Sequence, residues 1–553
     1  MASFSSLPNE LLEQIVGRLS QHDTSSFCRL NSHLHTLATP FLYRHVDLFV
    51  PPSNKLPRID YFCLNILKDS RKASNVKSIR LGVSPGESIT QGQQQLPHDS
   101  SFDHVYLLQK AMDIWTNETM FSTHAHLKEA LELREYSAYA ALIILVLPSL
   151  QHLHVTDCKS TTYDYLQALP DTLAPEPLGT PRFLAQSLVR RLSSITHTSL
   201  VFDQTRGIAY HNPNNYLTAD HFLNLPNMKS LELSVRGGKR HQSTLGTDVP
   251  LIRRIRPTNI TTLVFRHSGA FIESTRSLFQ CIPRLRSLTY DFLFDGFRVT
   301  HPVVDLAAWC DLLQPFQSTL EILVFSIEYC NKTGWFDHQP QVSEMLHGCL
   351  DMTHFPKLHT LEVPLPFLTG DSEFSIGTQV APLLPPNLRH LILRTDLSHA
   401  QHVFSLNPSF VQNGLSVKAS QRIAHYLMLA RRDVSYIYQT SLTLLDQATA
   451  LESLSIWQPA DPSLAWLDSQ VEDFATTCRN KNITGKILIP MLLRWKNAAH
   501  WDLMQEKVVF DREAPGLGPG TRFWRKEWEG RPVGLATQYL SYVLEFHPVK
   551  IYL

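Results

Sequence analysis

Closely spaced histidines are the residues of this sequence whose type and spacing are best suited to chemistry. They occur as pairs separated by one residue, at His33/His35, His124/His126 and His152/His154. Imidazole nitrogens bind metal ions and transfer protons, but two histidines at this spacing share a face only on a β-strand. His152 and His154 flank Leu153, so on a strand both would face away from the core. We interpret them as a surface pair, with a metal site as the alternative.

Known catalytic motifs do not occur in the sequence. It contains no G-x-S-x-G, no H-E-x-x-H, no phosphate-binding P-loop and no G-x-G-x-x-G, the spacings typical of many hydrolases and nucleotide-binding enzymes. The eight cysteines form no C-x-x-C pair and are expected to be reduced core residues. We therefore expect no catalytic residue, no cofactor and no metal ion. An enzyme whose site follows no known motif is the alternative.

A basic segment at residues 236–257 is a candidate site for an anionic ligand. Its cations are Arg236, Lys239, Arg240, Arg253, Arg254 and Arg256. Such groups bind phosphate or carboxylate, so a phosphorylated part of a substrate protein would suit them; the alternative is a solvated loop. The whole chain has 50 Lys+Arg and 50 Asp+Glu, so it has no overall field that would attract nucleic acid or an anionic membrane. We expect a protein partner, with no nucleic acid and no membrane.

Residues 7–48 have the pattern of three short amphipathic helices. The first helix has Pro8 at its start and an apolar spacing through Leu11, Leu12, Ile15, Val16 and Leu19. Asp23 is the expected N-cap of the second helix, and Pro40 is expected to kink or end the third. Three short helices make a small core, so we expect part of their apolar surface to dock on another protein.

This segment resembles the F-box family. Leu7-Pro8-x-Glu10-Leu11-Leu12 is similar to the family signature L-P-x-E-[IL]-[LI], and Arg29-Leu30-Asn31 and Leu42-Tyr43-Arg44 are similar to later motifs of fungal members. The resemblance covers about 42 of the 553 residues. It implies binding to a Skp-type adaptor and, through it, to a cullin and a RING protein. By this resemblance the adaptor-binding residues would be Leu7, Pro8, Leu11, Leu12, Ile15 and Leu19. A three-helix cap on the following domain is the alternative.

Behind this segment an apolar-x-x-apolar-x-apolar spacing recurs nine times. The middle residues of the nine units are Ile79, Leu153, Leu231, Leu263, Leu288, Leu323, Leu361, Leu391 and Leu454. The last three positions alternate as in a β-strand, and intervening segments such as residues 306–313 have a helical pattern. One strand and one helix cannot bury their apolar faces alone, but stacked neighbours can. The pattern predicts parallel strands inside and helices outside.

The repeat resembles the leucine-rich repeat (LRR). Residues 150–158 fit the consensus L-x-x-L-x-L-x-x-C, and LIILVLPSLQHLHV is similar to the irregular LRRs of fungal F-box proteins. The other units lack the consensus Asn or Cys. The distances in sequence between successive middle residues are about twice as long before Leu231 and after Leu391 as between them. Each long interval has room for a further unit, with residues 199–202 as one candidate. An α/β domain with leucine-rich strands is the alternative.

The expected chain is α/β, with an N-terminal three-helix F-box-like module followed by an irregular LRR solenoid and a C-terminal cap. We expect the helical module at residues 1–50, a linker and first helix at 51–75, the solenoid at 76–460 and the cap, helical with a surface hairpin or loop, at 461–553.

The expected function is that of the substrate-recognition subunit of an SCF-type (Skp–cullin–F-box) E3 ubiquitin ligase. The chain would tether a protein substrate for ubiquitin-dependent degradation, and the ligase complex would perform the transfer. An F-box/LRR interaction scaffold outside ubiquitin transfer is the alternative. The apolar run at 137–150 is shorter than a membrane span, and the first ten residues have no secretory pattern. We therefore expect an intracellular protein, in the cytoplasm or the nucleus.

Overall fold

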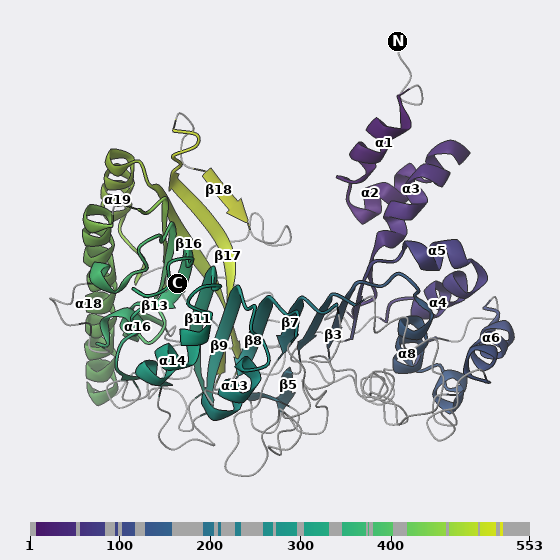
Figure 1. Ribbon diagram of the computed structural model, residues 1–553, viewed down its shortest axis with the longest axis horizontal. Helices are drawn as coiled ribbons and strands as arrows, with labels where there is room; N and C mark the ends of the chain where they lie inside the picture. The colour runs from purple at the N-terminus through teal and green to yellow at the C-terminus, as the bar shows by residue number, and fades with distance from the viewer. Residues whose placement is uncertain are drawn as a thin grey trace.

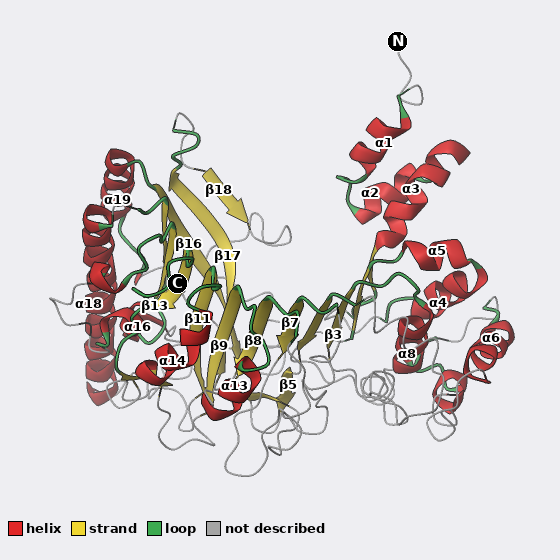
Figure 2. Ribbon diagram, viewed as in Figure 1, coloured by secondary structure: helices red, strands yellow, loops and turns green. Residues whose placement is uncertain are grey.

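The fold is mixed α/β and is built on a 14-stranded, mostly parallel sheet (Figure 1). The computed structural model describes residues 7–50, 56–82, 95–97, 102–116, 128–156, 192–198, 200–203, 208–211, 227–233, 258–268, 272–295, 304–330, 346–371, 374, 380–401, 417–448, 450–459, 464–495, 498–515 and 520–523. Figure 2 shows the strands as one continuous sheet with helices distributed along its length.

The strands follow one another across the large sheet in chain order. They are β1 (His45–Asp47), β2 (Ser78–Leu81), β3 (His152–Thr156), β4 (Ser194–Thr198), β7 (Ser230–Leu233), β8 (Thr262–Ser268), β9 (Ser287–Asp295), β11 (Ile322–Cys330), β13 (Thr360–Pro364), β14 (His390–Arg394), β15 (Ser453–Trp457), β16 (Thr484–Trp495), β17 (Ala498–Phe510) and β18 (Gly520–Phe523). Neighbours from β1 to β16 pair parallel, whereas β16, β17 and β18 pair antiparallel. Two small sheets join β5 (Leu200–Asp203) to β6 (Ile208–His211) and β10 (Val304–Asp305) to β12 (Leu346–His347).

Twelve α-helices lie within the described ranges. They are α1 (Asn9–Val16), α2 (Gln21–Phe27), α3 (Ser32–Arg44), α4 (Ile59–Lys68), α5 (Ser70–Asn75), α6 (His104–Thr116), α8 (Tyr136–Val146), α13 (Ile272–Phe279), α14 (Leu306–Leu313), α16 (Leu365–Thr369), α18 (Val417–Gln447) and α19 (Asp468–Lys481). In the part of the chain that these ranges cover, no helix combines the length and the apolar character needed to cross a membrane.

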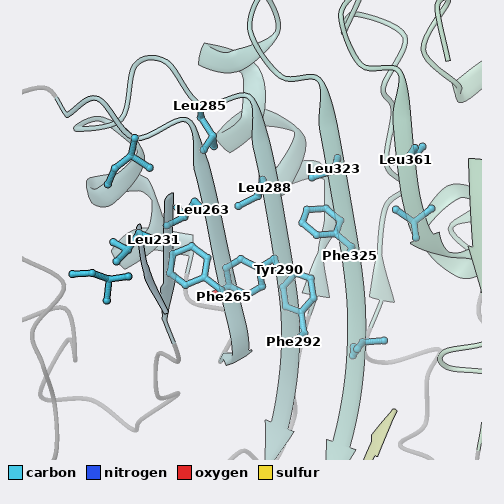
Figure 3. Packing of buried hydrophobic residues seen from close by; sticks show 14 of the residues in the cluster. Leu231, Leu263, Phe265, Leu285, Leu288, Tyr290, Phe292, Leu323, Phe325 and Leu361 are labelled. Carbon is cyan, nitrogen blue, oxygen red and sulfur yellow. The ribbon is translucent and has the colours of Figure 1, made fainter. Parts of the chain in front are cut away.

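The middle residues of the nine apolar repeats form a single ladder in the sheet. Each pairs with the middle residue of the next strand, and Val46 of β1 and Ile195 of β4 extend the same ladder. All these side chains are buried, and those of the central strands point to one side of the sheet (Figure 3). A slip of one residue would turn a strand's apolar side chains to the other face, so burial of this ladder specifies the register.

The helices cover the face of the sheet to which the ladder points. Residues of α4, α5, α6, α8, α13, α14, α16, α18 and α19 belong to the same continuous core as the ladder. At its centre Trp309 of α14 packs edge-on against Tyr290 of β9, with ring centroids 4.7 Å apart, and against Phe325 of β11 at 5.4 Å. Each large apolar side chain buried in this way contributes roughly 1.5–3 kcal/mol to folding.

Each parallel strand from β3 to β15 begins with the same hydrogen-bond arrangement. The carbonyl of the residue before one strand accepts bonds from two successive amides at the start of the next strand. Thr261 O accepts from the amides of Arg286 and Ser287 at 2.8 and 2.9 Å, for example. The same pairing recurs from Lys77 to Arg389. Because buried backbone groups require partners, this repeated bond aligns the strand starts along one edge.

The doubled steps in the sequence have two different structural causes. In two of them no strand is interposed, because β2 pairs directly with β3 and β14 pairs directly with β15. The additional chain supplies helices instead, α6 and α8 in the first case and the 31-residue α18 in the second. The expectation of room for a hidden unit is therefore wrong for these two steps.

The third doubled step does contain a strand, but not at the predicted residues. β4 supplies the missing ladder position with Ile195, whereas Leu200–Asp203 forms β5 and pairs antiparallel with β6 outside the large sheet. The prediction of a unit at residues 199–202 was wrong. That segment has the apolar composition of a strand, but the residues that pair with β3 precede it in the chain and belong to β4.

The sheet extends beyond the predicted repeats at both ends. β1 already pairs with β2 inside the segment expected to be the helical module, and α4 and α5 pack in the main core. At the other end, β16 continues past β15 with a register shift at Ile489/Pro490. A bulge bends a strand, and β17 contacts β11 although four strands lie between them in the order of the sheet.

Gly485 occupies the ladder position of β16, where the other strands carry an apolar side chain. A Cβ there would lie 2.6 Å from Sγ of Cys478 on α19 and 3.0 Å from Cγ2 of Val509. We expect Gly485→Ala to lower the free energy of unfolding by about 1–3 kcal/mol through overpacking, measured by urea denaturation. With Cys478→Ala in addition, the loss should be smaller than the sum of the two single losses. A stabilised Gly485→Ala protein would contradict this packing.

Candidate functional site

Helices α1, α2 and α3 form a small module with a core of its own. The buried residues of this core are Leu12, Val16, Phe27, Cys28, Leu34 and Ala38, and they are separate from the core that contains the sheet. Figure 1 shows the module at the N-terminal end of the sheet. Its outer surface is therefore not sealed by the main body.

Local capping defines the helix boundaries of the module. Ser20 Oγ accepts a bond from the amide of Asp23 at 3.1 Å, and Asn31 Oδ1 accepts one from the amide of Leu34 at 2.8 Å. The N-cap of α2 is thus Ser20 rather than Asp23, which was the wrong assignment because Asp23 lies in the first turn. α3 continues through Pro40 to Arg44.

The six residues assigned to adaptor binding divide between two faces of the module. Leu12 is fully buried in the module core, and Leu7 and Leu19 are half-buried at its edge. Ile15 is half-buried as well but is not packed against this core. Pro8 is exposed, and Leu11 is 46% exposed. The spacing of three and four residues places Pro8, Leu11 and Ile15 on one stripe of α1. Leu12 lies on the neighbouring face, about 100° around the helix from Leu11.

Leu30 is a further exposed apolar residue of the module that the site prediction missed. It follows α2 and is 66% exposed. The large exposed apolar residues of the described chain are Leu11, Leu30, Val105, Leu133, Met428 and Leu467, so two of the six lie in this short module. The sequence signal was the position of this leucine between two helices, directly before the N-cap Asn31. A leucine there belongs to no apolar helix face.

The module is joined to the sheet without a connecting loop. α3 ends at Arg44 and β1 begins at His45. Gln21 Nε2 donates to the carbonyls of Leu42 and His45 at 3.4 and 3.3 Å. The Tyr43 ring stacks on Phe62 of α4 at 6.1 Å, and this burial raises the pKa of the Tyr43 phenol. These contacts orient the module with respect to the sheet.

The histidine pairs are separated by their secondary structure or lie outside the described part. His152 is exposed and His154 half-buried on β3, on either side of the buried Leu153, so they face away from the core as predicted. His33 and His35 lie on α3, where this spacing makes side chains diverge. His124/His126 and the basic segment 236–257 lie outside the described residues. Within the described ranges no cluster of three or more His, Cys, Asp or Glu could hold a metal ion.

A buried ion network ties together strands near the C-terminal end of the sheet. Arg394 donates to Glu362 Oε1 at 2.7 Å and to Asp396 Oδ2 at 2.8 Å, and its guanidinium lies 4.4 Å from the centroid of the Trp457 ring. Asp396 also accepts the amide of Ile327 at 3.0 Å. Burial raises the pKa of the Asp396 carboxyl, against the opposing effect of Arg394.

The network has a structural explanation in the strand pairing. β11 pairs with β13 from Ile322 to Val324 and no further. β13 ends soon afterwards, and α16 follows it directly. Asp396 accepts the Ile327 amide that lies beyond this pairing. The Arg394 guanidinium bonds to two carboxylates, and the Asp396 carboxylate also accepts a backbone amide. We therefore assign these groups to stability and not to chemistry on a ligand.

Comparison with family models and with curated proteins identifies no relative of this chain. No family model matches it, and no curated protein is significantly similar to it.

Leu11 and Leu12 are adjacent, yet they should differ in their effects on stability. We expect Leu12→Ala to destabilise the module by about 2–5 kcal/mol, because it leaves a cavity in a small core. Leu11→Ala should cost less than about 1 kcal/mol, because its side chain is partly solvated. Hydrogen exchange of the amides of α1 to α3 in the full chain measures both changes. Equal loss of protection in the two variants would contradict the assigned faces.

Proposed function

We propose that this chain is the substrate-recognition subunit of an SCF-type ubiquitin ligase. In this proposal α1 to α3 form an F-box that binds a Skp-type adaptor and, through it, a cullin. The sheet and its helices form an irregular LRR solenoid that holds a protein substrate.

The observation that carries the proposal is the exposed apolar surface of a module with a separate core. Leu11 and Leu30 are 46% and 66% exposed, and Pro8 and Ile15 extend the stripe on α1. Burying one such leucine contributes roughly 1.5–3 kcal/mol, so a few of them offset part of the cost of association. The same segment carries the L-P-x-E-L-L sequence that resembles the F-box signature.

The architecture of the body supports the second part of the proposal. Its parallel strands follow in chain order with an apolar ladder on one face, and helices cover that face. Stacked strand–helix units of this kind present an extended polar sheet face for binding. The body departs from regular repeats in its spacing and in the length of α18.

The chain itself would perform no covalent step. Binding the adaptor through the module and the substrate through the sheet would raise the effective concentration of a substrate lysine near a ubiquitin-charged enzyme. The direct junction of α3 and β1 would hold the two binding surfaces in one relative orientation. The corresponding location is the cytoplasm or the nucleus, where free thiols such as those of Cys28 and Cys63 persist.

Leu11→Glu tests the adaptor contact. We expect this full-length variant to lose capture by a purified Skp-type adaptor at least tenfold, because a carboxylate would be desolvated in the apolar contact. Val105→Glu is the matched control, since Val105 is 80% exposed on α6, outside the module. A pull-down titration measures both, and circular dichroism checks that both variants remain folded.

Equal capture of the Leu11→Glu and Val105→Glu proteins would exclude α1 as the adaptor contact. Co-purification of a cullin together with the adaptor is the expected second result. Capture of the adaptor without any cullin would indicate an interaction scaffold in place of a ligase subunit.

A further inference from the structure

The edge of the sheet at which its first six strands start carries a strip of residues without acids. The strip consists of the residue before each strand and the first residue of each strand for β1, β2, β3, β4, β7 and β8, which are residues 44–45, 77–78, 151–152, 193–194, 229–230 and 261–262. All twelve residues are Arg, Lys, His, Gln, Ser or Thr, and none of them is buried. We call this set the donor strip, because every side chain in it can donate a hydrogen bond.

The equivalent positions further along the sheet have a different charge pattern. There Glu321 lies 3.6 Å from Arg286, and Glu452 lies 4.0 Å from Arg389. The acids of that part therefore neutralise its cations within the chain. The donor strip lacks such acids at its own positions.

Three cations of the donor strip remain available to a ligand. Arg44, Lys77 and Lys229 form no ion pair within the part of the chain that the structure describes. Two residues beyond the strand starts, Asp47 pairs with Arg80 at 3.4 Å, and β7 carries Glu232. The strip itself thus has the three positive charges of Arg44, Lys77 and Lys229 and no negative charge.

The spacing of these cations fits carboxylates distributed along an extended chain. Lys77 and Lys229 lie three strands apart in the order β2-β3-β4-β7, which corresponds to about 14 Å at the usual strand separation. An extended peptide rises about 3.3 Å per residue, so it covers this distance in about four residues. A single phosphate is bound best by cations that converge on it, and these cations are spread over several strands.

We propose that the donor strip binds an extended segment of a protein partner that carries aspartate or glutamate about every fourth residue. Lys77 and Lys229 pair with two of its carboxylates, and Arg44 extends the cationic row at the module end. Hydroxyl and imidazole groups at the first residue of each strand, such as those of Ser78 and His152, donate to the other carboxylate oxygens of the segment. That this partner is a ligase substrate rests on the function proposed above.

Peptide binding to the full-length chain tests the strip directly. The probe is a fluorescein-labelled peptide of about twelve residues with Glu at every fourth position, and the comparison peptide has Gln in place of Glu. We expect fluorescence anisotropy to show binding of the Glu peptide, weakened by added salt because exposed charges are screened. Lys77→Glu combined with Lys229→Glu should reduce its affinity at least tenfold.

Arg284→Glu combined with Lys357→Glu is the matched control, because both are exposed cations near the starts of β9 and β13, outside the strip. This pair should leave binding unchanged. Equal affinity for the Glu and Gln peptides, or no effect of the Lys77/Lys229 reversal, would overturn the proposal. Tighter binding of a phosphoserine peptide or of single-stranded RNA than of the Glu peptide would overturn it as well.

Adaptor capture, measured on the same proteins, separates this proposal from the proposed function. The Lys77/Lys229 variant should still bind the adaptor, because its changes lie on the sheet and not on α1. Retained capture with no peptide binding would remove the donor strip as a binding surface and leave the ligase proposal standing. Peptide binding without adaptor capture would support the strip and remove the ligase assignment.

Discussion

The parallel hydrogen-bond ladder at the strand starts is the constraint on which the rest of this structure depends. Each carbonyl that precedes a strand accepts two amides from the next strand, from Lys77 to Arg389. The ladder places Leu288, Leu323 and their equivalents in register, and the helices can then bury them on a single face. Because each strand start is hydrogen-bonded to the start of the previous strand, irregular insertions between strands do not change the register of the strand starts.

The ladder also explains where the irregular parts of the chain lie. A parallel pair needs a long crossover, and the crossover is free to vary as long as it returns to the same edge. The chain therefore accommodates α18 between β14 and β15 and α6 with α8 between β2 and β3. β13 stops pairing with β11 at Val324. Beyond that point the Asp396 carboxylate accepts the hydrogen bond of the Ile327 amide, which avoids the cost of an unpaired buried amide.

Two surfaces remain after the core is closed, and they differ in chemistry. The module exposes apolar side chains such as Leu11 and Leu30, whereas the edge at which the first strands start carries cations and hydroxyls such as the half-buried Lys77 and Ser78. Apolar surface favours a stable contact through burial, while polar and charged groups favour selectivity between partners. In the function that we propose, the first surface would attach the chain to a ligase core and the second would bind the substrate selectively.

The sequence by itself determined the α/β class, the nine ladder positions and the three short helices, because these depend on local periodicity. Only the tertiary structure decided which apolar residues of α1 face inward: Leu11 and Leu12 are equivalent in type, and the packing of α1 against α2 and α3 distinguishes them. Only the tertiary structure likewise showed the ladder positions of Ile195 and Gly485 and the acid-free donor strip. Their roles come from register and from neighbours distant in the chain, which local patterns do not contain.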